Sequence, residues 1–172
     1  VNSISRQLVS GEIDIDTAYE KFQNLKESDY PSWLKDIGLV IMCGCYAALY
    51  GATLLEMFVA GIAAIVLPLV YKLDAKLGLG MFITNLVSII PMVIIICYLQ
   101  ETIFPSIHIG IPIIGAIMPA VPGTAITNAI RDTLRGDYNS GTARAVEAAV
   151  TALSISIAVV IGLLIGGGVN PL

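Results

Sequence analysis

Charged residues are scarce in this sequence. Only 13% of its 172 residues are charged and 56% are hydrophobic, whereas about a quarter of the residues in a soluble domain are charged. The scarcity excludes an ordinary soluble protein and predicts an all-α fold, a polytopic bundle of membrane helices. The net charge of −4 indicates no particular partner, and we expect no nucleic acid among the partners.

Residues that often carry chemistry are also few, with one histidine and three cysteines. Cys43 and Cys45 point to different faces of a helix, and Cys97 lies in another apolar stretch, so we expect neither a disulfide nor a metal site. The sequence has no phosphate-binding loop, no zinc signature and no pair of intramembrane aspartates. We therefore expect no enzyme activity and no cofactor.

The N-terminal segment is the most polar part of the chain. Gly11 separates two short helices there, and Asp14 is placed to cap the second one. We expect residues 1–32 to be a cytoplasmic or interfacial helical segment, and residues 33–172 to be the transmembrane domain.

Five apolar stretches follow, each close to the ~20 residues that cross ~30 Å of hydrocarbon. They predict membrane helices over Trp33–Tyr50, Leu54–Tyr71, Leu79–Leu99, Ile107–Leu134 and Ala143–Gly166. With five crossings, all nine Lys and Arg residues fall on one side of the membrane. The positive-inside rule then predicts a cytoplasmic N-terminus and an outside C-terminus. An odd number of crossings also favours one half of a larger assembly.

The fourth stretch contains its own helix breakers. It is about 29 residues long, roughly 43 Å as a helix, so its centre lies near the bilayer midplane. Pro119 and Pro122 remove backbone donors at that centre, and Gly123 permits a kink or a reversal. We therefore predict that the fourth segment is broken at Pro119–Gly123, and that Thr124 caps the second half-helix.

A broken helix leaves N–H groups unpaired in the membrane, which is tolerated only against protein or in a water-filled cavity. The positive end of the second half-helix attracts a carboxylate, as in transporters that bind anionic substrates at the midplane. A kink that only packs helices is the alternative. The candidate substrate-binding residues are Pro122, Gly123, Thr124, Thr127, Asn128, Thr151 and Ser154.

Two further polar faces are open to either interpretation, because each can line a cavity or pack helices closely with hydrogen bonds between them. Thr84, Asn85 and Ser88 form a patch on the third stretch. On the fifth stretch, one narrow face at helical spacing carries Glu147, Thr151, Ser154, Ala158 and Gly162.

Charged groups beside the membrane are candidates for an inner gate or for proton coupling, because burying them is costly. Arg131 and Asp132 lie at the inner end of the broken helix, and Glu147 is spaced to pair with Arg144. Interfacial charges that merely anchor helices are the alternative.

Three more titratable residues, Glu56, Glu101 and His108, lie near the outer surface. We interpret them as solvated interface residues, with a proton-linked role as the alternative.

The most distinctive motifs of the chain resemble a known family. The runs "GEIDIDTAYEKFQNL", "YPSWL" and "MPAVPGTAITNAIRDTLRGDYNSGTARAVEA" are similar to the threonine/serine exporter family, especially to the larger subunit of its split two-component members, which are associated with export of succinate and related acids. The positions that match the motif are Pro122, Gly123, Asn128, Asp132, Gly136, Gly141 and Arg144.

The resemblance implies a secondary exporter subunit for threonine, serine or small dicarboxylates such as succinate, working by alternating access around the broken helix in a bacterial cytoplasmic (inner) membrane. It also implies a companion membrane subunit of the same family or a homo-oligomer. Family members typically carry a further N-terminal soluble region, and the chain begins at Val1, so we expect a truncated or partly represented polypeptide. A non-transporting membrane scaffold or sensor subunit is the alternative function.

Overall fold

The computed structural model describes residues 2–24 and 30–167. Within these ranges the elements are helices and no strand occurs. Four helices are long and apolar enough to cross a membrane, and a bent pair can make a fifth crossing. The predicted all-α polytopic membrane fold is confirmed. The chain divides into two compact units, residues 1–34 and 35–172.

The first unit contains two short helices, α1 (Asn2–Val9) and α2 (Ile15–Gln23). Gly11 has a φ of +76° in the turn between them, a conformation that L side chains rarely adopt. Asp14 takes the N-cap position of α2 in extended backbone, as predicted, although its side chain makes no capping hydrogen bond.

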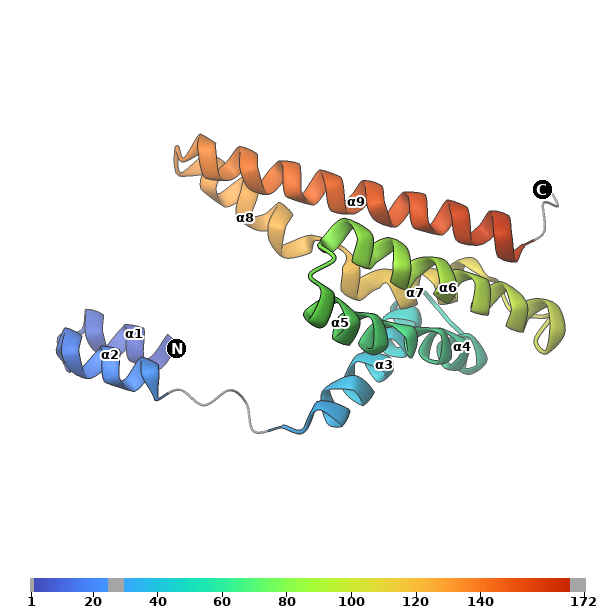
Figure 1. Cartoon of the computed structure of the whole chain (residues 1–172), viewed down its shortest axis with the longest axis horizontal. Coiled ribbons are helices and arrows are strands. Elements are labelled where there is room, and N and C mark those ends of the chain that lie inside the picture. The colour runs from blue at the N-terminus through green and yellow to red at the C-terminus, as the bar shows by residue number, and fades with distance from the viewer. Residues whose placement is uncertain (1, 25–29, 168–172) are drawn as a thin grey trace. The chain divides into compact units, whose positions relative to one another are not determined.

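The second unit holds the apolar helices (Figure 1). In chain order they are α3 (Ser32–Leu49), α4 (Leu54–Ala64), α5 (Val66–Leu77), α6 (Met81–Thr102), α7 (Gly110–Ile117), the short 3₁₀ helix η1 (Met118–Ala120), α8 (Gly123–Leu134) and α9 (Tyr138–Gly166). The five predicted spans are recovered with shifts of a few residues at their ends, since length and hydropathy follow directly from composition.

One interruption was not predicted. The second span, Leu54–Leu77, is long enough to cross as a whole, but it is divided at Ile65 into α4 and α5. Pro68 is the third residue of α5 and has no N–H to donate to the carbonyl of Ala64, so the helical ladder is interrupted there.

Helices α6 and α9 pack side by side and run in the same direction (Figure 1). Their contacts advance together along both helices, so the two axes are parallel and in register. The close pairs are Met81 with Thr151, Asn85 with Ser154, Val93 with Gly162 and Cys97 with Gly166.

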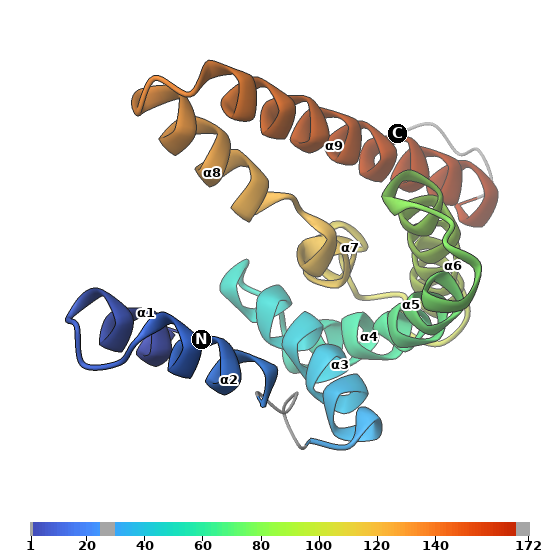
Figure 2. The same cartoon turned by 60° about the vertical axis from the view of Figure 1, so that its left-hand side comes forward.

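This parallel packing decides the topology of the bent pair. Because α6 and α9 point the same way, the chain between them must return to the side of the membrane where α6 begins. The segment from α7 to α8 makes that return, and α8 lies beside the first half of α9 in both views (Figures 1 and 2). The pair is therefore one crossing, and the unit has five crossings.

The apolar core of the second unit lies where α4, α6 and α7 meet, with α3, α5 and α9 contributing at its edges. Its fully buried members include Val59, Leu67, Ile89, Met92 and Ala116. Many other large apolar side chains point outward, as expected on a surface that faces lipid tails.

Candidate functional site

The break in the fourth span is the central feature of the candidate site. The axes of the two halves, Gly110–Ala120 and Gly123–Leu134, differ by 54°. Between them, Val121 is extended, with φ −65° and ψ 128°, and Pro122 has φ −80° and ψ 50°. The predicted discontinuity at Pro119–Gly123 is confirmed.

Two details of that prediction are wrong. Helix α8 begins at Gly123, and its N-cap is Pro122, which makes no side-chain cap, so Thr124 lies inside the first turn. Gly123 also does not make the bend, because it is itself helical and lacks a positive φ. The prolines and the extended Val121 interrupt the helix. An added Cβ at Gly123 would meet nothing within 4 Å, so the glycine leaves open space at the break.

The start of α8 presents unpaired donors. Across residues 2–24 and 30–167, no acceptor is found for the backbone N–H of Thr124 or of Ala125. The next donor, the N–H of Ile126, reaches the carbonyl of Pro122 at 3.1 Å. Free N–H groups at the positive end of a helix favour an anionic ligand.

The predicted polar side chains of α8 follow these donors. Thr127 Oγ1 donates to the carbonyl of Gly123 at 2.9 Å, and Asn128 Oδ1 accepts from the guanidinium of Arg131. Thr124, Thr127 and Arg131 are exposed and Asn128 is half-buried. The structure therefore brings these four residues together on one helix, beside the break.

The other two predicted binding residues lie elsewhere. Ser154 Oγ accepts from Asn85 Nδ2 at 2.8 Å and donates to the carbonyl of Thr151 at 2.7 Å, and Thr151 Oγ1 donates to the carbonyl of Glu147 at 2.8 Å. Thr151 and Ser154 are buried between α9 and α6. In this arrangement both side chains contribute to the packing of α9 against α6. A substrate contact from Thr151 or Ser154 therefore stays a prediction.

The candidate gate charges form a different pair from the predicted one. Arg144 Nε lies 3.0 Å from Asp132 Oδ2 across the turn between α8 and α9, whereas Arg144 was expected to pair with Glu147. Helix α9 starts earlier than predicted, and Gly141 packs so tightly on Thr133 that an added Cβ would lie 2.3 Å from Thr133 Oγ1. This close approach places Arg144 opposite α8. Glu147 is exposed.

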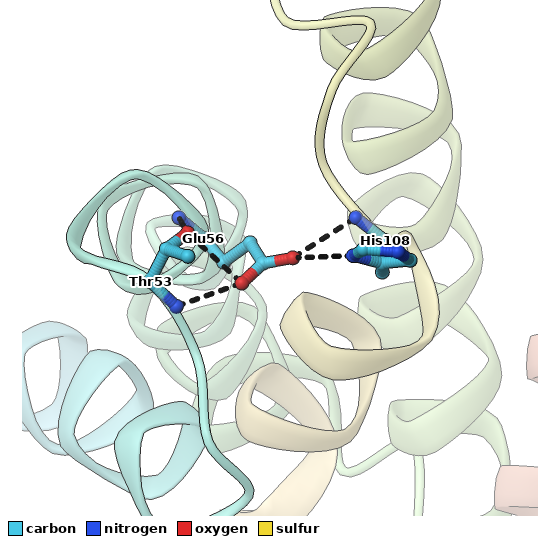
Figure 3. Close-up of polar contacts among 3 residues, drawn as sticks. All are labelled: Thr53, Glu56 and His108. Carbon is cyan, nitrogen blue, oxygen red and sulfur yellow. Dashed lines mark hydrogen bonds and ion pairs between the residues drawn. The ribbon is translucent and has the colours of Figure 1, made fainter.

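Glu56 is a functional candidate that the sequence interpretation missed (Figure 3). It was assigned to the solvated surface, but only 2% of the residue is exposed. Its Oε2 accepts from Thr53 N at 2.7 Å and from Thr53 Oγ1 at 2.9 Å, and its Oε1 accepts from the backbone N–H of His108 at 2.9 Å. The Thr-x-x-Glu capping box at the start of an apolar run was the available signal. The side chain of His108 is 86% exposed, as predicted for an interface residue.

A groove of about 470 Å³ lies between α3 and α4, away from the break. Its walls are apolar side chains and glycines together with Cys45. Such walls offer no group to hold a carboxylate, so we do not assign the substrate to it.

The cysteines and possible metal ligands add no further site in the described part of the chain. Its three cysteines are free, and no cluster of three His, Cys, Asp or Glu residues there is placed to hold a metal ion. Cys43 Sγ lies 3.7 Å from the carbonyl of Ala116, just before the break.

A sequence model of the family described as "Putative threonine/serine exporter" (ThrE) matches residues 1–166. The protein described as "Probable succinate transporter subunit YjjP" of Klebsiella aerogenes is 24% identical over 161 residues, which are 90% of this chain and 60% of that relative. The chain thus spans less than two thirds of the relative's length. No solved structure matches the chain.

Proposed function

The chain belongs to the threonine/serine exporter family, and on that premise we propose that it is a subunit of a secondary transporter that exports a small amino acid or a small dicarboxylate. The observation that carries the proposal is the break within the apolar fourth span, where two N–H groups that have no acceptor in the described part of the chain lie beside a polar helix face. Transport then works by alternating access around this break.

The substrate class follows from the donors. Threonine, serine and succinate all carry a carboxylate, which can accept from the N–H groups of Thr124 and Ala125 at the positive end of α8. Thr127 and Asn128 lie in the next part of the same helix and offer further hydrogen bonds. The description of the Klebsiella relative as a succinate transporter subunit supports a dicarboxylate.

The assembly follows from the open face of α8. Within the described chain, the main helix against which α8 packs is α9, and its exposed face carries Thr124, Thr127 and Arg131. Polar and charged groups are costly against lipid, so this face borders a water-filled path or another membrane chain. We propose a companion subunit of the same family or a second copy as that partner. The relative's description as a subunit supports this proposal.

The orientation is proposed from charge. The Lys and Arg residues all precede α3 or lie near the α5–α6 and α8–α9 turns, with Lys35 and Arg144 in the adjoining helix ends. We call the side of the membrane with these turns the basic side. By the positive-inside rule it is cytoplasmic in a bacterial inner membrane, with the N-terminus inside and the C-terminus outside.

The experiment is transport of labelled succinate, threonine and serine in vesicles, with the companion subunit present. Asn128→Ala and Thr124→Val remove polar groups beside the free donors, each worth about 1.5–3 kcal/mol with a charged ligand. Each should therefore raise the apparent substrate constant roughly ten- to a hundredfold. Thr102→Val is the matched control, because Thr102 is exposed at the far end of α6 and bonds only its own helix, at 2.6 Å to the carbonyl of Tyr98.

Two further variants separate the parts of the mechanism. Gly123→Leu should abolish transport by filling the open space at the break, although the backbone there has no strain to resist the change. Glu147→Gln tests proton coupling: it should remove the dependence on a pH gradient and spare exchange of substrate for substrate. Wild-type constants for both Asn128→Ala and Thr124→Val would leave the break as a packing kink.

A scaffold or sensor subunit remains the second candidate function. The buried positions of Thr151 and Ser154 favour it, because these side chains serve helix packing in this structure. Absence of transport with every candidate partner and substrate, together with specific binding of a partner, would support it.

A further inference from the structure

The geometry points to Glu56 as a latch that holds the start of the broken helix against α4, with His108 setting the strength of the latch by its protonation. The inference rests on the proposed function only where transport is concerned. The latch lies on the side of the membrane opposite the basic side, where α4 begins and where the loop after α6 leads into α7.

A capping box alone does not explain this carboxylate. In a capping box the acid needs one oxygen, and here Glu56 Oε2 alone accepts both donors of Thr53. The second oxygen, Oε1, is committed to the backbone N–H of His108, a residue 52 positions away in sequence. The carboxylate therefore joins the first turn of α4 to the segment that enters α7 (Figure 3).

The chemistry of the site requires an acid rather than an amide. Both oxygens of Glu56 accept hydrogen bonds, from Thr53 on one side and from His108 on the other. A glutamine would turn an NH₂ group toward one of these donors. With 2% of the residue exposed, water does not replace the lost bond, so the charge is held by the three donors and by the positive ends of α4 and α7.

The imidazole of His108 adds a variable charge. Its Nδ1 lies 3.4 Å from Glu56 Oε1, and the side chain is 86% exposed, so it exchanges protons freely with the solution on that side. Among the residues that the structure describes, the charged side chain within ion-pair distance of the His108 imidazole is Glu56. The other titratable side chains at this end are exposed: Glu101 and Tyr98 on α6, and Tyr50 after α3.

The direction of the effect follows from the charge. A protonated His108 places a cation beside the buried carboxylate, with its Nδ1 3.4 Å from Glu56 Oε1, whereas a neutral imidazole offers no such attraction. A more acidic solution on this side therefore strengthens the latch, and a more basic one weakens it. In an exporter, movement of α7 from α4 would open the transport path on the side where the substrate leaves.

The test combines hydrogen exchange and thermal unfolding of the full chain in detergent or nanodiscs at pH 5.5 and pH 8. The wild type should show a higher protection factor for the amide of His108, taken relative to the intrinsic exchange rate at each pH, and a higher Tm, at the lower pH. Glu56→Gln should remove the exchange protection at both pH values and lower the Tm by about 4–10 °C. Glu101→Gln is the matched control and should behave as the wild type does.

His108→Gln isolates the side chain, because the backbone N–H that binds Glu56 remains. This variant should keep the exchange protection and lose its dependence on pH. Where Glu56→Gln does not fold, the wild type and His108→Gln still decide the matter. Equal protection of the His108 amide at both pH values in the wild type, or an unchanged pH dependence in His108→Gln, would overturn the inference.

Transport provides the separate readout. Under the latch, the rate of export should rise with pH on the release side in the wild type and be flat in His108→Gln, with the substrate constant unchanged in both. Loss of all transport while the exchange pattern holds would count against the proposed function and leave the latch standing.

Discussion

Gly115 lets α7 approach α3 at backbone distance, and replacing it tests how the first half of the broken helix is seated. A Cβ at Gly115 would lie 2.6 Å from Ala47 Cβ and 2.8 Å from Ala47 N. Non-bonded carbon atoms prefer about 3.5–4.0 Å, so Gly115→Ala must separate the two helices by about 1 Å. Both contact atoms belong to a helix, so no flexible side chain can move aside.

The magnitude follows from two opposing terms. Overpacking of this kind destabilises by about 1–3 kcal/mol, and the better helix propensity of alanine offsets about 0.5–1 kcal/mol of it. We expect a net loss of about 1–2 kcal/mol. For a chain of this size, that loss corresponds to a Tm lower by about 2–8 °C.

The assay is thermal unfolding in detergent or nanodiscs, with Gly123→Ala as the matched control. Gly123 is also helical and close to the break, but a Cβ there meets nothing within 4 Å, so its Tm should be unchanged or higher. Adding Ala47→Gly to Gly115→Ala should restore only part of the Tm, because Ala47 N and Cα would still lie 2.8 and 2.9 Å from the new Cβ. Equal Tm values for the two single variants would refute the reasoning.

Three further outcomes are expected. Ser154→Ala leaves a buried amide of α6 without its acceptor at 2.8 Å and should destabilise the protein by about 1–3 kcal/mol, measured by thermal unfolding. Replacing Pro119 and Pro122 together by alanine restores two backbone donors, so spin labels on α7 and α8 should report a bend smaller than 54° and substrate affinity should fall. Hydrogen bonds donated by the Ser140 hydroxyl, and to a smaller extent by the Ser140 backbone N–H, lower the pKa of Asp137. The Asp137 cap therefore stabilises α9 above about pH 4, and this stabilisation is lost as the pH falls further. Asp137→Asn should therefore reduce the loss of Tm that the wild type shows in acid.

The break in the fourth span was predictable because its causes are local. A proline lacks its N–H in any surroundings, and two of them at the centre of an over-long apolar stretch interrupt the helix wherever it packs. The same rule applies to Pro68, yet the division between α4 and α5 was missed. The second stretch has an ordinary length for one crossing, so its length did not indicate that the helix is divided.

The glycines show where local reasoning stops. Gly123 was expected to shape the backbone and does not, whereas Gly115, Gly141 and Gly162 each lie where an added Cβ would come within 2.6 Å or less of a neighbouring side chain. No conformational signal marks these three, because none of them has a positive φ. Their role depends on how closely another helix approaches.

Composition, the length of the apolar stretches and the position of the prolines were sufficient for the membrane class, the spans and the broken helix, since each of these depends on residues close together in the chain. Packing between distant segments decided the rest. It turned Thr151 and Ser154 toward α6, paired Arg144 with Asp132, and buried Glu56 against the backbone of His108. Whether a polar group is buried, and what it binds there, depends on atoms contributed by other helices, and these come together only when the chain folds.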